Sequence, residues 1–280
     1  MKNFVVWGIL GVAALCAAGC GSSTPQATLT PEERFAKAKT LFEKEDYLEA
    51  INEFTVLTLQ YQGSSFAADA QYYLGECRFQ RGEFLLAAYE YSVLKRSFPA
   101  SARVADGQYK LALCYYNLAP KSNLDQQYTR KAIDEFQSFV EYYPAHSLAA
   151  DADQKIKELN GRLAKKQYDS ARLYARMAYY RAALISYDVV IEKYHDTEYA
   201  PLSYIGKAEI LMARDRYAEA ATEIEKFLDR FPNSVLRSRA EDLKRTIEKE
   251  LGKQQKAGSA AGTGNPLGAQ PIGTGGGSAE

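Results

Sequence analysis

Few side chains in this sequence have the type and spacing that chemistry on a substrate requires. The two histidines, His146 and His195, fall in equivalent turns after aromatic-containing helix ends, where neither needs a chemical role. Asp151 and Asp153 form an isolated acidic pair at an expected helix start, where the helix dipole already favours carboxylates. The motifs GxxxxGK[ST], GxSxG, HExxH and CxxC, which hold phosphates, nucleophiles or metals, are absent. The sequence therefore predicts a protein that is not an enzyme and that holds no metal or cofactor.

Cys20 is the residue whose setting predicts a covalent modification. A lysine at position 2 is followed by the uncharged run FVVWGILGVAALCAA, which is shorter than the roughly 20 apolar residues of a spanning helix. Such a run is typical of the apolar core of a secretory signal peptide. The segment Ala17-Ala18-Gly19-Cys20 resembles the bacterial lipoprotein box, in which the cysteine thiol is diacylated and a peptidase cuts before it. The alternative is an ordinary signal peptide with a chance cysteine.

The lipoprotein interpretation divides the N-terminus into a signal peptide (1–19) and a lipidated flexible tether (20–30). The lipid on Cys20 would be the chain's only attached group, and its two or three acyl chains anchor firmly where one alone would not. Gly21 is not the aspartate that retains enterobacterial lipoproteins in the inner membrane. The resemblance thus implies lipid anchoring at the periplasmic face of an outer membrane.

The charge balance and the positions of the cysteines limit which partners and which disulfides are expected. With 35 basic and 35 acidic side chains the chain has no basic excess, which argues against nucleic acid as a partner. Cys16 would leave with the signal peptide and Cys20 would be acylated, so only Cys77 and Cys114 could pair. They occupy matching points of neighbouring repeats, and stacked helices lie about 10 Å apart. A disulfide needs Cα atoms within about 7 Å, so both are expected to be buried thiols.

One pattern of residues recurs five times along the chain. Each copy places alanine, aliphatic and aromatic residues at steps of three and four, the period of an amphipathic helix. The small residue predicts a second helix crossing against it, and an aromatic residue followed by proline predicts the helix end. The marker alanines of the five copies are Ala50, Ala87, Ala132, Ala183 and Ala220.

A partner helix is expected before each copy, and the resulting pairs resemble tetratricopeptide repeats. The partner segments read FAKAKTLF, AQYYLGECRF, GQYKLALCYY, SARLYARMAYY and SYIGKAEILMA. No strand pattern competes, so the predicted fold is all-α, a right-handed α-solenoid of about five tetratricopeptide repeats with a C-terminal capping helix. Within the solenoid (31–251) the repeats are expected near 31–64, 68–101, 105–145, 164–196 and 201–234, followed by the capping helix at 235–251.

Three segments depart from the regular repeat. An insertion at 117–128 separates the two helices of the third repeat. The helix after Pro144 either runs long to Arg176 or breaks once near Gly161. The tail from 252 to 280 is rich in glycine, alanine and serine and has almost no large apolar residue, so it is expected to stay disordered.

The first helices of a solenoid line a concave groove, and the repeat register places aromatic residues there in two rows. Such rows suit an extended or helical peptide with apolar anchors, because each ring buries a large area at low rotamer cost. The same residues could instead serve only to pack neighbouring helices. Few lysines accompany them, which disfavours a basic clamp for a C-terminal carboxylate. The two rows are Phe35, Tyr72 and Tyr109, and Phe42, Phe79 and Tyr116.

Taken together, these features resemble the BamD family, the lipoprotein subunit of the outer-membrane β-barrel assembly machinery. The resemblance covers residues 15 to about 250 and is most specific in YYPAHSLAADA (142–152), RLAKKQYDSARLY (162–174) and AALISYDVVIEKYHDT (182–197). It implies a periplasmic scaffold that binds the periplasmic domains of the barrel-forming subunit and receives segments of unfolded outer-membrane proteins. Substrate peptides would take the aromatic rows, and the barrel subunit would take the last two repeats, including Arg181, Arg214 and Arg216.

Two positions depart from the family's pattern. Ser186 stands where many members carry an arginine, and His195 replaces the usual turn proline. Other periplasmic repeat lipoproteins remain open as alternatives: a pilotin-like scaffold for pilus or secretin assembly, or a scaffold linked to the cell wall. An enzyme or an enzyme-attached lipoprotein is the third possibility, and the absent motifs disfavour it.

Overall fold

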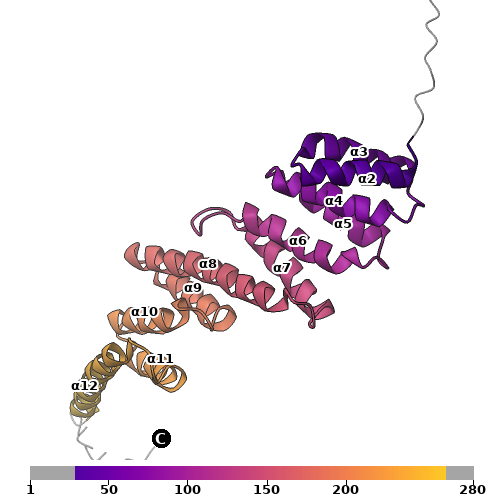
Figure 1. The fold of residues 1–280 in the computed structure, drawn as a ribbon. Coiled ribbons are helices and arrows are strands. Elements are labelled where there is room, and N and C mark those ends of the chain that lie inside the picture. Colours follow the sequence, from indigo (N-terminus) through magenta and orange to yellow (C-terminus); the bar gives the residue numbers. More distant parts are fainter. Residues whose placement is uncertain (1–28, 263–280) are drawn as a thin grey trace, which may run out of the picture. The chain divides into compact units, whose positions relative to one another are not determined.

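A computed structural model describes residues 29–262, and within that range every regular element is an α-helix (Figure 1). The predicted all-α class is therefore confirmed, whereas the right-handed sense of the solenoid stays a prediction. The signal peptide, Cys20 and most of the tether lie outside the described residues. The helices are α2 (Pro31–Glu43), α3 (Tyr47–Gln60), α4 (Ala67–Gln80), α5 (Phe84–Ser97), α6 (Arg103–Leu118), α7 (Gln127–Tyr142), α8 (Ala149–Arg176), α9 (Tyr180–Lys193), α10 (Tyr199–Ala213), α11 (Tyr217–Arg230) and α12 (Arg237–Gly262).

The chain divides into two compact units, with the boundary after Leu111, inside α6. In unit 1, which ends at Leu111, α2 packs on α3, α3 on α4, and α4 on α5. In unit 2, which begins at Ala112, each helix from α7 to α12 packs on the next, and α8 also contacts α10. Both units are thus stacks of consecutive helix pairs, as tetratricopeptide repeats require.

The marker alanines lie where helices cross most closely. Ala50, Ala87, Ala132, Ala183 and Ala220 are all 0% exposed. Large side chains one turn later on the same helices fill the space between pairs, among them Phe54, Tyr91 and Phe136, each 0% exposed. The alternation of small and large positions read from the sequence is therefore the packing pattern of the core.

Four turns within repeats share one backbone conformation. Glu45, Gly82, Ala178 and Asp215 have φ between 57° and 73°, and each stands two residues before the aromatic residue that begins the next helix. In the first of these turns the Glu45 N–H donates to the Phe42 carbonyl and the Asp46 N–H donates to the Leu41 carbonyl. This is the Schellman motif, which uses a left-handed residue to satisfy the last carbonyls of a helix.

The third repeat contains the predicted insertion, which lies between the end of α6 and the start of α7. Side chains of α8 fasten it: Lys166 Nζ donates to the Leu124 carbonyl at 2.5 Å, and Arg162 donates to the Ala119 carbonyl at 3.2 Å. Inside the loop, Gln126 is 1% exposed and its amide donates to the Lys121 carbonyl at 2.8 Å. The insertion is therefore an ordered strap against α8.

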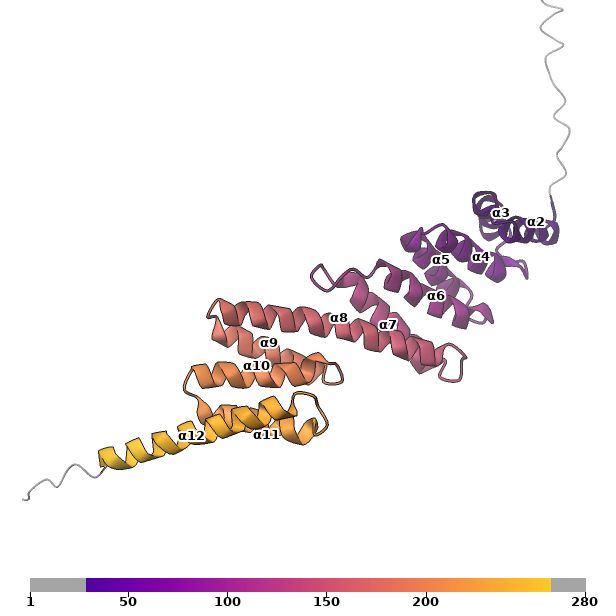
Figure 2. The ribbon, with the colours of Figure 1, turned by 60° about the vertical axis from the view of Figure 1, so that its left-hand side comes forward.

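Helix α8 resolves one alternative and corrects one segment. Its 28 residues run without a break through Gly161 to Arg176, as Figure 2 shows. The segment SARLYARMAYY, expected to be one helix, instead spans the end of α8, a turn at 177–179 and the first residue of α9. The left-handed conformation of Ala178 ends the helix there, a break that no glycine announces in the sequence.

The C-terminal helix is longer than predicted. The capping helix expected at 235–251 begins at Arg237 and continues to Gly262, so residues 252–262 are helical where disorder was expected. Ala240 and Ile247 are both 0% exposed in the core that α12 shares with α10 and α11. After Gly252 the sequence Lys-Gln-Gln-Lys-Ala consists of strong helix formers, which lets the helix continue past its buried part. Residues 263–280 lie outside the described range.

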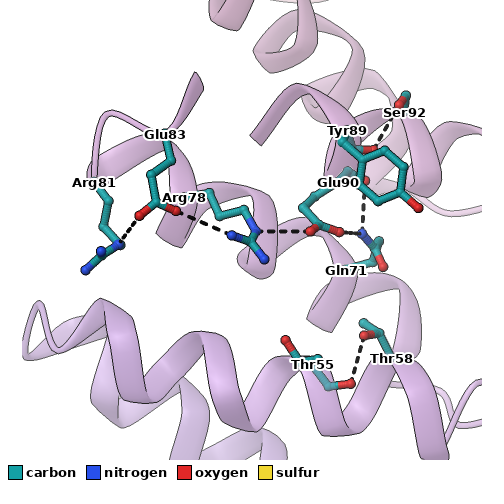
Figure 3. Close-up of polar contacts among 9 residues, drawn as sticks. All are labelled: Thr55, Thr58, Gln71, Arg78, Arg81, Glu83, Tyr89, Glu90 and Ser92. Atoms are coloured by element: carbon teal, nitrogen blue, oxygen red, sulfur yellow. Dashed lines mark hydrogen bonds and ion pairs between the residues drawn. The ribbon is translucent and has the colours of Figure 1, made fainter. Parts of the chain in front are cut away.

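A buried polar network ties α4 to α5 in unit 1 (Figure 3). Glu90 is 8% exposed and accepts hydrogen bonds from the Gln71 amide at 2.8 Å and from Arg78 Nε at 3.0 Å. Arg78 also donates to Glu83 at 3.4 Å, and Arg81 donates to the same carboxylate at 2.7 Å. The buried carboxylate of Glu90 is thus partnered, as burial of charge requires.

Candidate functional site

The six aromatic residues predicted to line the groove are largely occupied with packing. Phe35 stacks on Phe66 at a centroid distance of 5.2 Å and meets Phe54 edge-on at 5.9 Å. Tyr109 is only 7% exposed. Tyr72 packs on Tyr91 at 5.9 Å, and burial raises its pKa. These contacts support the alternative that the rings pack neighbouring helices. Four of the rings still keep part of their surface exposed: Phe35, Phe42, Tyr72 and Phe79.

Cations cover several of these rings in unit 1. Lys39 Nζ lies 5.4 Å from the centroid of Phe42, the Arg103 guanidinium lies 5.2 Å from that of Tyr72, and Lys110 Nζ lies 5.0 Å from that of Phe79. Arg103 also pairs with Asp69 at 2.6 Å, and Lys110 pairs with Glu76 at 2.9 Å. The face expected to be poor in lysine is therefore balanced between acid and base, a pattern of cation–π and ion-pair contacts that sequence spacing did not reveal.

Tyr116, the last of the six, lies in unit 2 and is engaged by α8. Its hydroxyl donates to Glu158 at 2.6 Å, and this hydrogen bond raises its pKa. Lys155 Nζ lies 4.8 Å and the Arg162 guanidinium 5.4 Å from the ring centroid. Tyr116 therefore joins α6 to α8.

The structure brings the three predicted interface arginines together in unit 2. Arg181, Arg214 and Arg216 line one open hollow of about 1060 Å³. Arg181 is the second residue of α9, whereas Arg214 and Arg216 belong to the turn between α10 and α11. The turns before α9 and α11 have the same left-handed conformation at Ala178 and Asp215, so consecutive repeats present equivalent residues to the same hollow. We call this the arginine hollow.

The three guanidinium groups differ in how they are held. Arg216 makes two hydrogen bonds to Glu219, whose pKa is lowered by that contact. The Arg214 guanidinium lies 5.5 Å from the ring centroid of Tyr180. Arg181 is exposed and has no ion pair within residues 29–262. At least one guanidinium is thus available to a carboxylate from another molecule.

An apolar surface accompanies these charges. Tyr179 and Ile185 line the hollow and are 58% and 56% exposed, and nearby Leu173 and Met177 are 47% and 51% exposed. Exposed apolar side chains beside an arginine that makes no ion pair are typical of protein interfaces. Sequence patterning did not indicate their exposure, although the Tyr179-Tyr180-Arg181 run has the composition of interface hot spots.

The residues expected from the sequence to have no chemical role lie in the rest of the described chain. Within the described part of the chain, no group of three or more histidine, cysteine, aspartate or glutamate side chains could hold a metal ion. His146 packs on Phe139 at 5.2 Å, and His195 is exposed in a turn. Ser186 is 5% exposed, so this position offers no surface to a partner. Across residues 29–262, no helix has the length and hydropathy needed to cross a membrane.

Comparison with known proteins identifies relatives of the chain. Residues 27–209 match the family model YfiO, described as an outer membrane lipoprotein. The outer membrane protein assembly factor BamD of Caulobacter vibrioides is 24% identical over 193 residues, which cover 67% of this chain and 63% of the relative. The chain thus spans less than two thirds of that relative's length.

Two solved structures of repeat proteins are also similar. The TPR2AB domain of yeast Sti1, in its pHSP90 complex, has a TM-score of 0.43 at 16% identity, over 81% of this chain and 86% of that one. A tetratricopeptide repeat protein of Thermus thermophilus has a TM-score of 0.34 at 17% identity, over 79% of this chain and 99% of that one.

Proposed function

The chain belongs to the YfiO family of outer membrane lipoproteins, and from that premise we propose that it is a non-enzymatic scaffold of outer-membrane protein assembly. In this proposal acyl groups on Cys20 anchor the chain at the periplasmic face of the outer membrane. Its two units then present protein-binding surfaces to the periplasm.

The observation that carries the proposal is the arginine hollow. Arg181, Arg214 and the exposed ring of Tyr179 offer cationic and apolar contacts on one surface of unit 2. A protein domain with an acidic rim and an apolar centre complements this surface. We assign that role to the periplasmic domains of the barrel-forming subunit, since a relative of this chain is an outer membrane protein assembly factor.

Unfolded outer-membrane protein segments are assigned to unit 1. The partly exposed rings of Phe42 and Phe79 lie beside Lys39 and Lys110, which suits segments that carry apolar and acidic residues. Phe35 and Tyr72 are also partly exposed and extend the same contact. This contact uses only the part of each ring that internal packing leaves open.

Capture from outer membranes tests the partner. The tagged chain is extracted in mild detergent and the proteins that come with it are identified by mass spectrometry. We expect a barrel protein with periplasmic domains to co-purify with the wild type, and Arg181→Glu with Arg214→Glu to lose it. The matched control, Arg96→Glu with Lys193→Glu, reverses two exposed charges outside the hollow and should retain it. A secretin, pilus or cell-wall partner in place of the barrel protein would replace the proposed function.

Membrane fractionation tests the anchor. Cys20→Ser should release the chain into the soluble periplasm, because the acyl groups would have no thiol to carry them. Cys77→Ser, which removes a buried thiol instead, should leave the chain in the outer membrane. Retention of the Cys20→Ser variant in the membrane would refute the lipid anchor.

A further inference from the structure

A second, smaller pocket lies in unit 2 among α8, α10 and α12. It has a volume of about 360 Å³ and shares no residue with the arginine hollow. Its wall carries Tyr168 and Arg172 from α8, Gly206 and Glu209 from α10, and Arg239 from α12. Figure 2 shows α8 and α10 running side by side, in agreement with their contacts. Because these are first helices of successive pairs, the pocket opens on the face where repeat proteins of this class bind ligands.

A close approach between α9 and α10 builds the floor of this pocket. A Cβ atom at Gly206 would lie 2.6 Å from both Cζ and the hydroxyl oxygen of Tyr187, so only glycine lets that ring reach between the helices. The rings of Tyr168 and Tyr187 lie 5.9 Å apart. Burial raises the pKa of Tyr187 to about 12, so its hydroxyl keeps a proton to donate at neutral pH.

The charged side chains that line this pocket carry a net positive charge. Arg239 donates to Glu209 at 2.5 Å, which occupies one of its five N–H groups. Arg172 is exposed, lies 5.8 Å from the ring centroid of Tyr168, and has no ion pair within the described part of the chain. Two guanidinium groups therefore face one carboxylate, a net charge that a single monoanion would neutralise.

We propose that this pocket binds one carboxylate group of a peptide segment, with Arg172 and Arg239 as the receiving side chains and Tyr168 as the apolar wall. A guanidinium group matches a carboxylate in a two-pronged geometry, and the phenol hydroxyls supply further donors. Glu209 repels a dianion, which favours a carboxylate over a phosphate group. The volume is at the lower end of ligand pockets and suits a single residue. The carboxylate is either the C-terminus of a chain or the side chain of aspartate or glutamate.

Calorimetry with short peptides on the detergent-solubilised full chain tests the proposal. The three probes are the peptide Ala-Gly-Ser-Ala-Leu with a free C-terminus, its amide, and Ala-Gly-Glu-Ala-Leu-amide. Binding of the first probe alone assigns the pocket to a chain terminus, and binding of the third assigns it to an acidic side chain. Either result supports the proposal. If neither carboxylate peptide binds better than the neutral amide, or if phosphate displaces them more readily than acetate, the proposal is wrong.

Three variants connect that binding to the pocket. The double variant Arg172→Gln with Arg239→Gln should bind the carboxylate peptide with an affinity lower by roughly tenfold or more, since charge-assisted hydrogen bonds are lost. The control, Arg176→Gln with Arg245→Gln, changes exposed arginines of the same two helices outside the pocket and should leave the affinity unchanged. Glu209→Gln should tighten binding severalfold because it removes the competing carboxylate. Equal affinity in the first variant and the wild type, or weaker binding by Glu209→Gln, would overturn the assignment.

Discussion

Replacing two helical glycines by alanine should change stability in opposite directions, because only one of the two positions is needed for close packing. At Gly75 in α4 a Cβ atom would lie 2.7 Å from Cε1 and 2.9 Å from Cζ of Tyr91. Tyr91 is 0% exposed and its hydroxyl donates to Glu76, so the ring has no room to withdraw. At Gly161 in α8, no atom outside the local helix lies within 4 Å of the added Cβ.

The magnitudes follow from two competing terms. Alanine in place of a mid-helix glycine stabilises by about 1 kcal/mol. Overpacking in a filled core costs about 1–3 kcal/mol. Gly161→Ala should therefore stabilise its unit by about 1 kcal/mol, whereas Gly75→Ala should destabilise its unit by about 1 kcal/mol after the helix gain is subtracted.

Native-state hydrogen exchange is the suitable assay, because it reports the protection of each helix by itself. A change of about 1 kcal/mol alters the protection of amides that exchange through unfolding of the unit by about fivefold. We expect amides of α4 to lose protection in Gly75→Ala and amides of α8 to gain it in Gly161→Ala. Unchanged or increased protection of α4 in Gly75→Ala would show that Tyr91 can yield, and the packing argument would fail.

Three further predictions concern turns, polar burial and the thiol. Both Gly82 and Ala178 have left-handed backbone, which glycine adopts more easily than alanine. Gly82→Ala should therefore lower the free energy of unfolding by about 1 kcal/mol, and Ala178→Gly should raise it. Urea unfolding measures both changes, and a change of the same sign in the two variants would contradict the turn argument. Glu90→Ala should lower the free energy of unfolding by about 2–3 kcal/mol in the same assay, because Gln71 and Arg78 lose their buried acceptor. The conservative Glu90→Gln should have a smaller effect. Unchanged stability in Glu90→Ala would show that water replaces the carboxylate. Burial raises the pKa of Cys77 to about 12, so iodoacetamide at about pH 8.5 should label it slowly in the native chain and rapidly in urea, where the ordinary thiol pKa returns; rapid native labelling would mean that α4 opens readily.

Repeat period and marker residues were sufficient to predict the helices, because the burial of one small residue per helix is a local property of the sequence. Ala50 and Ala220 lie where the pattern placed them, as do the buried thiols Cys77 and Cys114. The end of α8 at Arg176 agrees with one of the two predicted courses of this helix. The turn inside the segment SARLYARMAYY was missed, since its left-handed residue is Ala178 and alanine carries no signature of that conformation. The extension of α12 was missed because the helix formers after Gly252 are a short run inside a tail that is rich in glycine and serine.

The candidate sites also contain features that the sequence could indicate and features that it could not. Arg181 and Arg214 lie on one surface because equivalent turns of adjacent repeats face the same side, which the repeat register could indicate. The charge of the aromatic face in unit 1 was not predictable, because Arg103 and Lys110 reach it from a neighbouring helix. The smaller pocket was also missed: Arg172 and Arg239 are far apart in sequence and meet only through the packing of α8, α10 and α12.

The unbroken course of α8 has a mechanical consequence for unit 2. Its 28 residues extend about 42 Å, and the helix packs against α7, α9 and α10, with the strap of the insertion tied to it. Other repeats follow one another through a short turn, whereas α8 extends through the junction between the third and the fourth repeat. We therefore expect α8 to limit bending between the third and the fourth repeat, so that a displacement of α7 is transmitted to α9 and α10.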